Sequence, residues 1–436
     1  DYQRVQALLH EIPPSLPFST SPEIRAECRA LIKQAKEQGR QTLTHSETAQ
    51  VLEAYGIPTA TSAYVHSPEE ALVVAERFPG PKALKVVHEG NCRPYRYRKH
   101  PHKISAGLLQ DLETPEQVAE GVRRLGDKVQ EKFPEHAIRE YCLQPMQRGK
   151  HSMQICAGIT RDPVFGPLIV FGIGGYKVNV LADRQVALPP LNMSLASDVV
   201  GRTHAASLIR EHSADPERDI QHLCQLLVKL SQMASDLTDL RGLELNPLLL
   251  NRDGMLAVDF AMDLGHPARF AIMPYPEELR EWVTLNNGWQ VEVRPIRAED
   301  APLITTFHRQ LSEESIRFRY FHNKSNLTQR DLSILSHINY DRQMAFIAEH
   351  QHDDGSKEML GVVRVWNDPD NIRTEFSIII RDDLQGLGIG SLLMKKMIDY
   401  CTSIGTLEMI GKIMVDNHPM RALMKHLGFR CRYNME

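Results

Sequence analysis

The stretch EFSIIIRDDLQGLGIGSLLMKK, residues 375–396, constrains the fold more than any other part of the sequence. It begins with β-branched and apolar residues, which favour a strand, and continues with three closely spaced glycines, Gly386, Gly388 and Gly390. An amphipathic segment follows, so the pattern predicts a strand, a tight turn and a helix. Such a turn directs the unpaired N–H groups of a helix N-terminus toward one point, where a phosphate can bind.

Three phosphate-binding patterns were weighed for these glycines. A P-loop needs GxxxxGK followed by Ser or Thr, and no such Lys follows here. A dinucleotide-binding turn needs the spacing GxGxxG and an acid about 20 residues later, whereas this spacing is GxGxG and no suitable acid follows. The third pattern is Gln-x-x-Gly-x-Gly, which Gln385, Gly388 and Gly390 match. In the plainest alternative, the glycines only permit a tight turn between a strand and a helix.

The third pattern resembles the pyrophosphate loop of Gcn5-related N-acetyltransferases (GNATs). Around the loop we expect the strands WQVEVRPI, MAFIAEH, EMLGVVRVW and TEFSIII, and helices at 298–311, 327–336, 390–402 and 418–426. Beyond the loop, MVDNHPMRALMKHLGF contains the Asn and the helix ending in Leu-Gly-Phe that usually close this fold. The resemblance covers about residues 288–436 and implies an acetyltransferase with acetyl-CoA as cosubstrate.

The resemblance also implies which residues bind the acyl-CoA. The strand residues Ile378, Ile379 and Ile380 would part from a neighbouring strand and pair with the pantetheine amides, which leaves the thioester at the gap. Asn417 would hydrogen-bond to the cofactor arm. Backbone amides of the loop would bind the pyrophosphate, from the residues Gln385, Gly386, Leu387, Gly388, Ile389, Gly390 and Ser391.

Acylation of an amine needs a general base, because the lysine pKa is near ~10.4 and an ammonium group has no lone pair. Glu375 begins the strand before the loop, and acids at this position act as the base in similar enzymes; a solvated strand-end residue is the alternative. Many relatives have a Tyr as general acid where this chain has Met424, so either water supplies that proton or no acid is needed. Cys401 falls well along the helix and no Cys lies on the strand or loop, which favours direct attack in a ternary complex.

The region before residue 266 alternates strand-like and helix-like segments. We expect a helix over about 215–237 and a β-hairpin in LELNPLLLNRDGMLAVDFAM that turns at Asp253-Gly254. SPEEA predicts a capping box in which Ser67 and Glu70 exchange hydrogen bonds with each other's backbone. The region is therefore mixed α/β.

Residues 23–265 resemble the ATP-grasp part of NDP-forming acyl-CoA synthetases, relatives of the succinyl-CoA synthetase β subunit. The supporting stretches are LEAYGIPT, KALKVVH, RDPVFGPLIVFGIGG, LADRQVALPPLNM and LELNPLLL. The resemblance implies a nucleotide site with Lys85, Gln144 and Met146. Asn246 and Asp259 supply oxygen ligands of the kind that Mg²⁺ takes; a surface Lys85 and a turn-forming Asn246 are the alternatives.

Two positions depart from the active relatives of this region. Gln154 and Gly242 stand where those enzymes usually have Glu. We therefore do not expect this region to make acyl-CoA by itself, whereas ATP and Mg²⁺ binding stays open.

These observations predict an α/β multidomain protein with an ATP-grasp-like domain followed by a mixed-sheet GNAT domain. The expected boundaries are a lead at 1–22, the ATP-grasp-like domain at 23–265, a linker at 266–287 and the GNAT domain at 288–436. This order resembles the bacterial Pat-type protein lysine acetyltransferases, which implies acetylation of target proteins such as AMP-forming acyl-CoA synthetases, with the front domain regulatory. The alternatives are N-acetylation of small-molecule amines and a non-catalytic acyl-CoA sensor. The family is compatible with a homo-oligomer.

Composition narrows the classes of partner. The formal net charge is −4 over 436 residues, which argues against bulk nucleic-acid binding, and no apolar run is long enough to cross a bilayer. The seven cysteines form no CxxC pair, so we expect reduced thiols in a cytoplasmic protein with no membrane partner.

Overall fold

The computed structural model describes residues 20–88, 107–132, 138–146, 153–175, 183–251, 254–322 and 326–432. The chain divides into two compact units, one of which is Leu16–Ala271 while the other contains Ile272–Glu436. Residues 1–19 of the predicted lead lie outside the described part. Helix α2 (Pro22–Glu37) follows, with Ser21 as its N-cap. Because the two units are separate bodies, each is described by itself.

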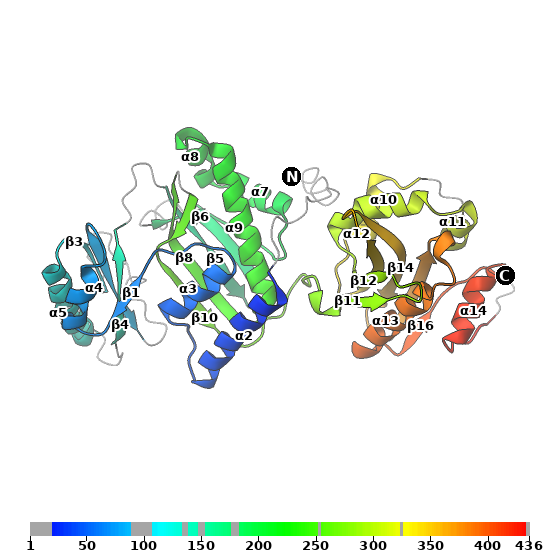
Figure 1. Cartoon of the computed structure of the whole chain (residues 1–436), viewed down its shortest axis with the longest axis horizontal. Helices are drawn as coiled ribbons and strands as arrows, with labels where there is room; N and C mark the ends of the chain where they lie inside the picture. The colour runs from blue at the N-terminus through cyan, green and yellow to red at the C-terminus, as the bar shows by residue number, and fades with distance from the viewer. Residues whose placement is uncertain are drawn as a thin grey trace. The chain divides into compact units, whose positions relative to one another are not determined.

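A four-stranded antiparallel sheet in the first unit has the order β1-β4-β2-β3 (Figure 1). Its strands are β1 (Ala63–Val65), β2 (Lys82–His88), β3 (Leu108–Leu112) and β4 (Ile138–Pro145). Helices α4 (Pro68–Ala75) and α5 (Pro115–Lys132) pack their apolar residues against it. At the start of α4, Ser67 Oγ accepts from the Glu70 N–H at 3.1 Å, but the Glu70 carboxylate accepts from the His66 N–H. The predicted capping box is therefore right for Ser67 and wrong for Glu70.

A second sheet in this unit has the order β10-β8-β5-β6-β7, and β9 pairs with β8. Its strands are β5 (Met153–Asp162), β6 (Gly166–Ile173), β7 (Arg184–Ala187), β8 (Leu240–Asn251), β9 (Gly254–Ala257) and β10 (Phe260–Leu264). The helices around it are α3 (His45–Ala54), α7 (Met193–Gly201), α8 (His204–His212) and α9 (Pro216–Asp236). The predicted hairpin is confirmed by the pairing of Asn251 with Gly254; residues 252–253 lie outside the described part.

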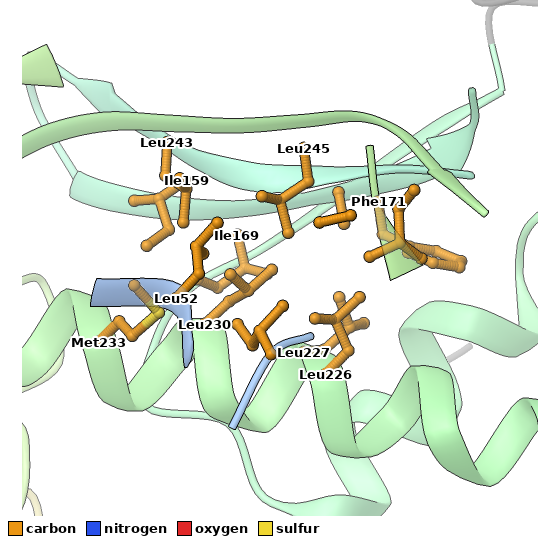
Figure 2. Packing of buried hydrophobic residues seen from close by; sticks show 14 of the residues in the cluster. Leu52, Ile159, Ile169, Phe171, Leu226, Leu227, Leu230, Met233, Leu243 and Leu245 are labelled. Atoms are coloured by element: carbon orange, nitrogen blue, oxygen red, sulfur yellow. The ribbon is translucent and has the colours of Figure 1, made fainter. Parts of the chain in front are cut away.

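Helix α9 builds the largest core of the chain's first unit. Asp215 caps it and Pro216 begins it, as an N-terminal cap and a first-turn proline predict. Leucines and a methionine at helical spacing then point at the sheet, and Figure 2 shows this packing. The labelled residues are Leu226, Leu227, Leu230 and Met233 from α9, Leu52 from α3, and Ile159, Ile169, Phe171, Leu243 and Leu245 from the sheet.

The second unit is built on a six-stranded sheet with the order β11-β12-β13-β14-β15-β16, antiparallel except for the β15–β16 pair. Its strands are β11 (Glu281–Thr284), β12 (Gln290–Pro295), β13 (Gln343–Gln351), β14 (Lys357–Asn367), β15 (Arg373–Ile380) and β16 (Glu408–Ile410). Strand β11 comes from the stretch 266–287 that we predicted as a linker, so part of that stretch belongs to this sheet. The exact domain boundaries stay a prediction.

Helices cover both faces of this sheet (Figure 1). Helices α10 (Ala301–Arg309), α11 (Glu313–Tyr320) and α12 (Gln329–Ser336) lie on one side, and α13 (Ile389–Ser403) and α14 (His418–His426) pack on the other. The bounds of α14 are those predicted from the sequence, and α13 begins one residue earlier than predicted.

The structure bears on two expectations from composition, reduced cysteines and the absence of a membrane span. Of the cysteines that the structure describes, Cys431 is exposed, the others are buried, and none forms a disulfide. No helix in the described ranges is long and apolar enough to cross a membrane.

Candidate functional site

The first element of the candidate acetyltransferase site is a gap at one edge of β15. Strand β16 pairs with β15 only at Arg373, Thr374 and Glu375, whereas β14 pairs with β15 as far as Ile380. Beyond Glu375, the described residues therefore leave one edge of β15 without a neighbouring strand. The stretch 378–380 lies along this open edge, with Ile378 and Ile380 packed toward α13 and Ile379 toward the opposite face.

The glycine turn follows directly on β15. Gly386 and Gly388 have φ of +87° and +89°, a left-handed conformation that glycine adopts without steric cost. Gly388 is also the N-cap of α13, and no side chain caps this helix. In the described part of the chain, no acceptor is hydrogen-bonded to the amides of Gly386, Gly388, Ile389, Gly390 or Ser391. These amides form an anion-binding arrangement of the kind found at helix N-termini.

The open surface of the turn leaves room for a ligand. Gln385, Gly386 and Gly388 are exposed, and a Cβ on Gly388 would meet nothing within 4 Å. At Gly390 the packing is tighter, because a Cβ there would lie 3.2 Å from Leu423 Cδ2 in α14. Leu387 packs against the core instead of into solvent. The turn is therefore open to solvent at Gly386 and Gly388 and packed against α14 at Gly390.

Hydrogen bonds hold the start of the turn to helix α11. The Asp382 carboxylate accepts from the Ser312 N–H at 2.8 Å, from the Ser312 hydroxyl at 2.9 Å and from the Ser315 hydroxyl at 2.6 Å. Partial burial raises the pKa of Asp382, but these hydrogen bonds outweigh it and the net pKa is lowered. Arg381, just before, is paired with the carboxylates of Asp383 and Glu358. The amides of the turn are thus preorganised before any ligand binds.

Glu375 lies where β15 and β16 part. Its cross-strand partners are Trp366 on β14 and Ile410 on β16, which are 38% and 36% exposed. Because directly paired residues lie on the same face of a sheet, the exposed Glu375 carboxylate stands between two exposed apolar side chains. Sequence reasoning identified Glu375 but missed Trp366 and Ile410, since only the strand register brings them beside it.

The other predicted residues of this unit lie on α14. Asn417 is its N-cap, and its side-chain oxygen accepts from the Met420 N–H at 3.1 Å. Its predicted contact with the cofactor arm stays a prediction. Met424, at the position of the absent acid, is 1% exposed and belongs to the apolar core. Residue 424 is therefore part of the apolar core, where a polar side chain would need a hydrogen-bond partner.

A cavity of about 930 Å³ lies in the first unit and is lined by both of its sheets. All five residues predicted for the nucleotide and the metal line it, namely Lys85, Gln144, Met146, Asn246 and Asp259. Stretches far apart in the sequence therefore converge on one space. Its size falls within the range typical of small-molecule sites.

Lys85 joins the two sheets across this cavity. Its Nζ donates to the Val258 carbonyl at 2.8 Å and to Asp259 Oδ1 at 3.3 Å. Asn246 Oδ1 accepts from the Gly175 N–H at 2.8 Å, so both predicted metal ligands already have protein partners. Their oxygens are nevertheless of the type that Mg²⁺ accepts together with water and substrate phosphates. The described residues contain no cluster of three or more His, Cys, Asp or Glu side chains that could hold a metal alone.

Gln144 has one atom that points to a ligand. Its Nε2 donates to Ser62 Oγ at 2.8 Å, while its Oε1 is buried and has no hydrogen-bond partner. The side chain is 1% exposed, and a buried acceptor without a partner costs about 1–3 kcal/mol. A ligand with an N–H donor would remove this cost.

The two departures noted in the sequence lie in the same cavity. Gln154 and Gly242 both line it, and Gln154 packs so close to Gly175 that a Cβ there would lie 1.7 Å from its Oε1. Sequence reasoning missed five charged residues of the lining, Arg161, Arg184, Arg241, Glu244 and Asp263. Their isolated charges carry no motif, and only the sheet pairing brings them to this space.

Comparisons with known proteins cover both units. The ATP-grasp domain family matches residues 34–264, and the acetyltransferase (GNAT) domain family matches residues 290–430. The β subunit of acetate–CoA ligase (ADP-forming) II from Pyrococcus furiosus is 27% identical over 236 residues, which are 54% of this chain and 96% of that protein. Acetyltransferase PA5475 from Pseudomonas aeruginosa is 33% identical over 149 residues, 34% of this chain and 80% of that protein.

One solved structure is similar to about half of this chain. It is the dinucleotide forming acetyl-coenzyme A synthetase 1 of Ca. Korarchaeum cryptofilum in complex with coenzyme A, Ca-AMPCP and HgCl⁺, at 24% identity and a TM-score of 0.47. The match covers 54% of this chain and 99% of that chain. The chain spans only about a third, 33% and 32%, of two longer ADP-forming CoA ligases that it also matches.

Proposed function

The chain belongs to the ATP-grasp family and carries a GNAT acetyltransferase domain after it, and from this premise we propose that it transfers acetyl groups from acetyl-CoA to lysine side chains of proteins. The observation that carries the proposal is the position of Glu375. This carboxylate lies at the point where β15 and β16 separate, on the strand that leads into a turn with five free amides. A base, a thioester gap and a diphosphate site thus follow one another along one segment.

The acceptor side of Glu375 suits an extended aliphatic amine. Trp366 and Ile410 flank the carboxylate and are partly exposed. The methylene stem of a lysine could lie along these two side chains while its amine reaches the carboxylate, because long charged side chains cover apolar surface with their stems. Such a site supports a lysine acceptor over a small polar amine.

In the proposed mechanism the amine attacks the thioester directly. Glu375, through a water, removes a proton from the lysine ammonium, and the neutral nitrogen attacks the carbonyl carbon. A backbone N–H at the open edge of β15 polarises the carbonyl oxygen. The N–C bond forms, the C–S bond breaks and CoA leaves as a thiolate.

The state of Cys401 supports this route over an acyl-enzyme route. Cys401 is buried within α13, and burial raises the pKa of its thiol to about 12, so it is protonated at neutral pH and a poor nucleophile. Met424 offers no proton for the leaving thiolate, so water supplies that proton. The mechanism therefore needs one catalytic side chain, Glu375.

The test is to incubate the protein with isotopically labelled acetyl-CoA and a cell lysate, and to map labelled lysines by mass spectrometry. We expect a small set of proteins, with acyl-CoA synthetases among them, to gain label at lysine. The Glu375→Gln variant, which keeps the shape of the side chain, should lose this labelling.

The alternatives give different results in the same material. Label on free amines from a panel, with none on protein, would show a small-molecule N-acetyltransferase. Acetyl-CoA binding without transfer to any acceptor would show a sensor. Either result would contradict protein lysine acetylation.

We further propose that the cavity of the first unit binds ATP with Mg²⁺ and regulates the acetyltransferase. The unpaired Gln144 Oε1 would accept from the amino group of adenine, Lys85 would neutralise phosphate charge, and Asn246 and Asp259 would hold the metal. The metal, when bound, screens the phosphate charge. To reach phosphate, the Lys85 ammonium would have to leave Asp259, one of the two proposed metal ligands.

Calorimetry with ATP and Mg²⁺ tests this second proposal. Lys85→Met should weaken ATP binding about tenfold or more, as expected for loss of charge-assisted hydrogen bonds. Lys82→Met is the matched control, because Lys82 is a buried lysine on the same strand whose Nζ donates to the Gly80 and Glu113 carbonyls outside the cavity. No binding of ATP by the wild-type protein, or equal weakening in both variants, would contradict the assignment.

A further inference from the structure

One arginine of the second unit is buried without an anionic partner. Three arginines there are nine-tenths buried or more, Arg294, Arg364 and Arg381. Arg294 is paired with the carboxylates of Asp300 and Glu349, and Arg381 with those of Asp383 and Glu358. Arg364 is 4% exposed, and within the described part of the chain its guanidinium makes no hydrogen bond and no ion pair.

The positive charge of Arg319 further disfavours the charged form of Arg364. Arg319 and Tyr320 lie at the end of α11, which packs over β15, and the Arg319 guanidinium carbon is 5.1 Å from the centre of the Tyr320 ring. Burial and the positive charge of Arg319 lower the pKa of Arg364 to about 9, and burial lowers the pKa of Arg319. With a pKa of about 9, the Arg364 guanidinium still carries charge at neutral pH. The arginine pair, buried Arg364 and partly exposed Arg319, therefore concentrates positive charge beside a phenol, and no carboxylate among the described residues forms an ion pair with either arginine.

Such a pair is unusual, because buried charges in proteins are generally paired. Two like charges in a poorly solvated place repel each other, and both lose hydration. A bound anion would supply the missing charge and accept the guanidinium N–H groups. A carboxylate matches this planar geometry in two parallel hydrogen bonds, as a phosphate does.

The pair lies one step along the sheet from the proposed base. Arg364 is the cross-strand partner of Ser377, as Trp366 is of Glu375. Since alternate residues of a strand share a face, Glu375 and Ser377 point to the same side, about 7 Å apart. Ser377 Oγ is buried and has no hydrogen-bond partner, so a hydroxyl donor stands beside the two guanidinium groups.

The strand register also indicates how long a chain must be to bring an anion from the thioester to Arg364. The thioester would lie beside Glu375 at the open edge of β15. The next pair of residues, Arg364 and Ser377, lies ~7 Å further along the strands. A short acyl chain with a carboxylate at its far end is the carrier that suits this spacing.

We propose that Arg364 and Arg319 bind the distal carboxylate of a short dicarboxylic acyl group on the donor, so that the enzyme accepts a succinyl-type CoA thioester. The inference rests on the proposed acyl transfer and names a further donor for the same site. The amine nitrogen bonds to the thioester carbonyl carbon, the C–S bond breaks and CoA thiolate leaves. The proton passes by way of Glu375 to solvent, and the distal carboxylate stays unchanged. An acidic group of the acceptor is the competing source of the carboxylate.

The donor is the better source because Arg364 is buried. A short acyl chain that starts at the thioester carbon beside Glu375 can carry a carboxylate to this guanidinium. An acceptor lysine would instead lie along the exposed apolar pair Trp366 and Ile410. The two sources make different predictions for donor selectivity.

The experiment measures the affinity of the whole protein for succinyl-CoA and for butyryl-CoA by calorimetry. The two donors share coenzyme A and acyl chain length and differ in the distal charge. We expect the wild-type protein to bind succinyl-CoA about tenfold or more tightly than butyryl-CoA, as hydrogen bonds to charged groups predict. This ratio should fall to about one in Arg364→Gln and in Arg319→Gln. Equal affinities in the wild-type protein, or a ratio that both variants retain, would overturn the inference.

Thermal unfolding of each variant shows whether a lost donor preference comes from a lost fold. Because Arg364 has no anionic partner among the described residues, Arg364→Gln should keep or raise the melting temperature, whereas Arg294→Gln, which breaks a buried ion pair, should lower it. Kinetics then separates the sources: a rise in the acceptor KM with every donor in Arg364→Gln would place the carboxylate on the acceptor and overturn the inference. Absence of transfer from any donor, with the binding ratio as expected, would overturn the proposed function while the donor site stands.

Discussion

Replacing Glu375 with Gln is the most informative single change at the proposed acceptor site. The side chain is exposed at the end of the β15–β16 pairing, so the substitution removes a charge and leaves the packing of the sheet intact. Glutamine has the same shape but cannot take a proton from an ammonium group. Folding and acetyl-CoA binding should therefore be preserved.

The expected loss follows from the protonation of the acceptor. At pH 7.5 a lysine with pKa near ~10.4 is neutral in about one molecule in a thousand. Without a base, the enzyme must wait for this fraction, so kcat should fall by about 10³, within the range of about 10²–10⁴ typical of general-base catalysis. The rate of the variant should also rise about tenfold per pH unit up to about pH 10, because the neutral fraction rises in that proportion.

Steady-state acetyl transfer between pH 7 and pH 9.5, with CoA release as the readout, measures both effects. Glu408→Gln is the matched control: Glu408 lies on neighbouring β16, its side chain is 53% exposed, and among the described residues its one ion pair is with the exposed Arg373. That variant should keep wild-type kinetics, since exposed ion pairs contribute little. A Glu375→Gln enzyme within about threefold of wild type, or one that loses acetyl-CoA affinity in the same proportion as kcat, would refute the assignment as base.

Three further predictions concern the turn and the core of the second unit. Gly388→Ala forces an alanine into a left-handed conformation, which costs about 1–2 kcal/mol. Acetyl-CoA binding measured by calorimetry should therefore weaken about 5- to 30-fold. The control is Gly405→Ala, at a glycine with φ of +79° and equally open space, which should lower the melting temperature without weakening acetyl-CoA binding. Burial raises the pKa of Glu349, but Arg294 and Lys357 outweigh it and lower the pKa below its usual value. Its contribution is therefore present above about pH 4.3 and lost as the pH falls through the lowered pKa, and acid unfolding followed by circular dichroism should show a flatter pH dependence in Glu349→Gln. Arg294→Gln leaves buried carboxylates without their partner and should cost about 3–5 kcal/mol in urea unfolding; a cost below about 1 kcal/mol would contradict this.

The sequence predicted those elements whose local pattern is strong. Helix α14 was predicted at its observed bounds, because Asn417 and a proline begin it and Gly428 follows it. Helix α11 was not predicted, since its sequence EESIRFRY is largely charged and has only Ile316 buried. Strands β11 and β16 are only four and three residues long, which is too short for a strong local pattern.

For the candidate sites, motifs gave the residues that act through the backbone or through a family pattern. The glycine turn, Glu375 and Lys85 could be identified in this way. The partners around them could not, because Trp366, Ile410 and Arg364 become neighbours only through strand register. Whether a charged residue is buried without a partner depends on helix placement as well, and no local pattern encodes that.

The account depends on the claim that the turn after β15 binds the diphosphate of an acyl-CoA. Hydrogen-exchange mass spectrometry of the whole protein with and without acetyl-CoA tests it directly, because five amides of residues 386–391 have no acceptor in the described structure. We predict that saturating acetyl-CoA slows exchange at 385–391 more than anywhere else in the second unit, and that ATP with Mg²⁺ does not. Saturable acetyl-CoA binding with unchanged exchange at 385–391 would contradict the account.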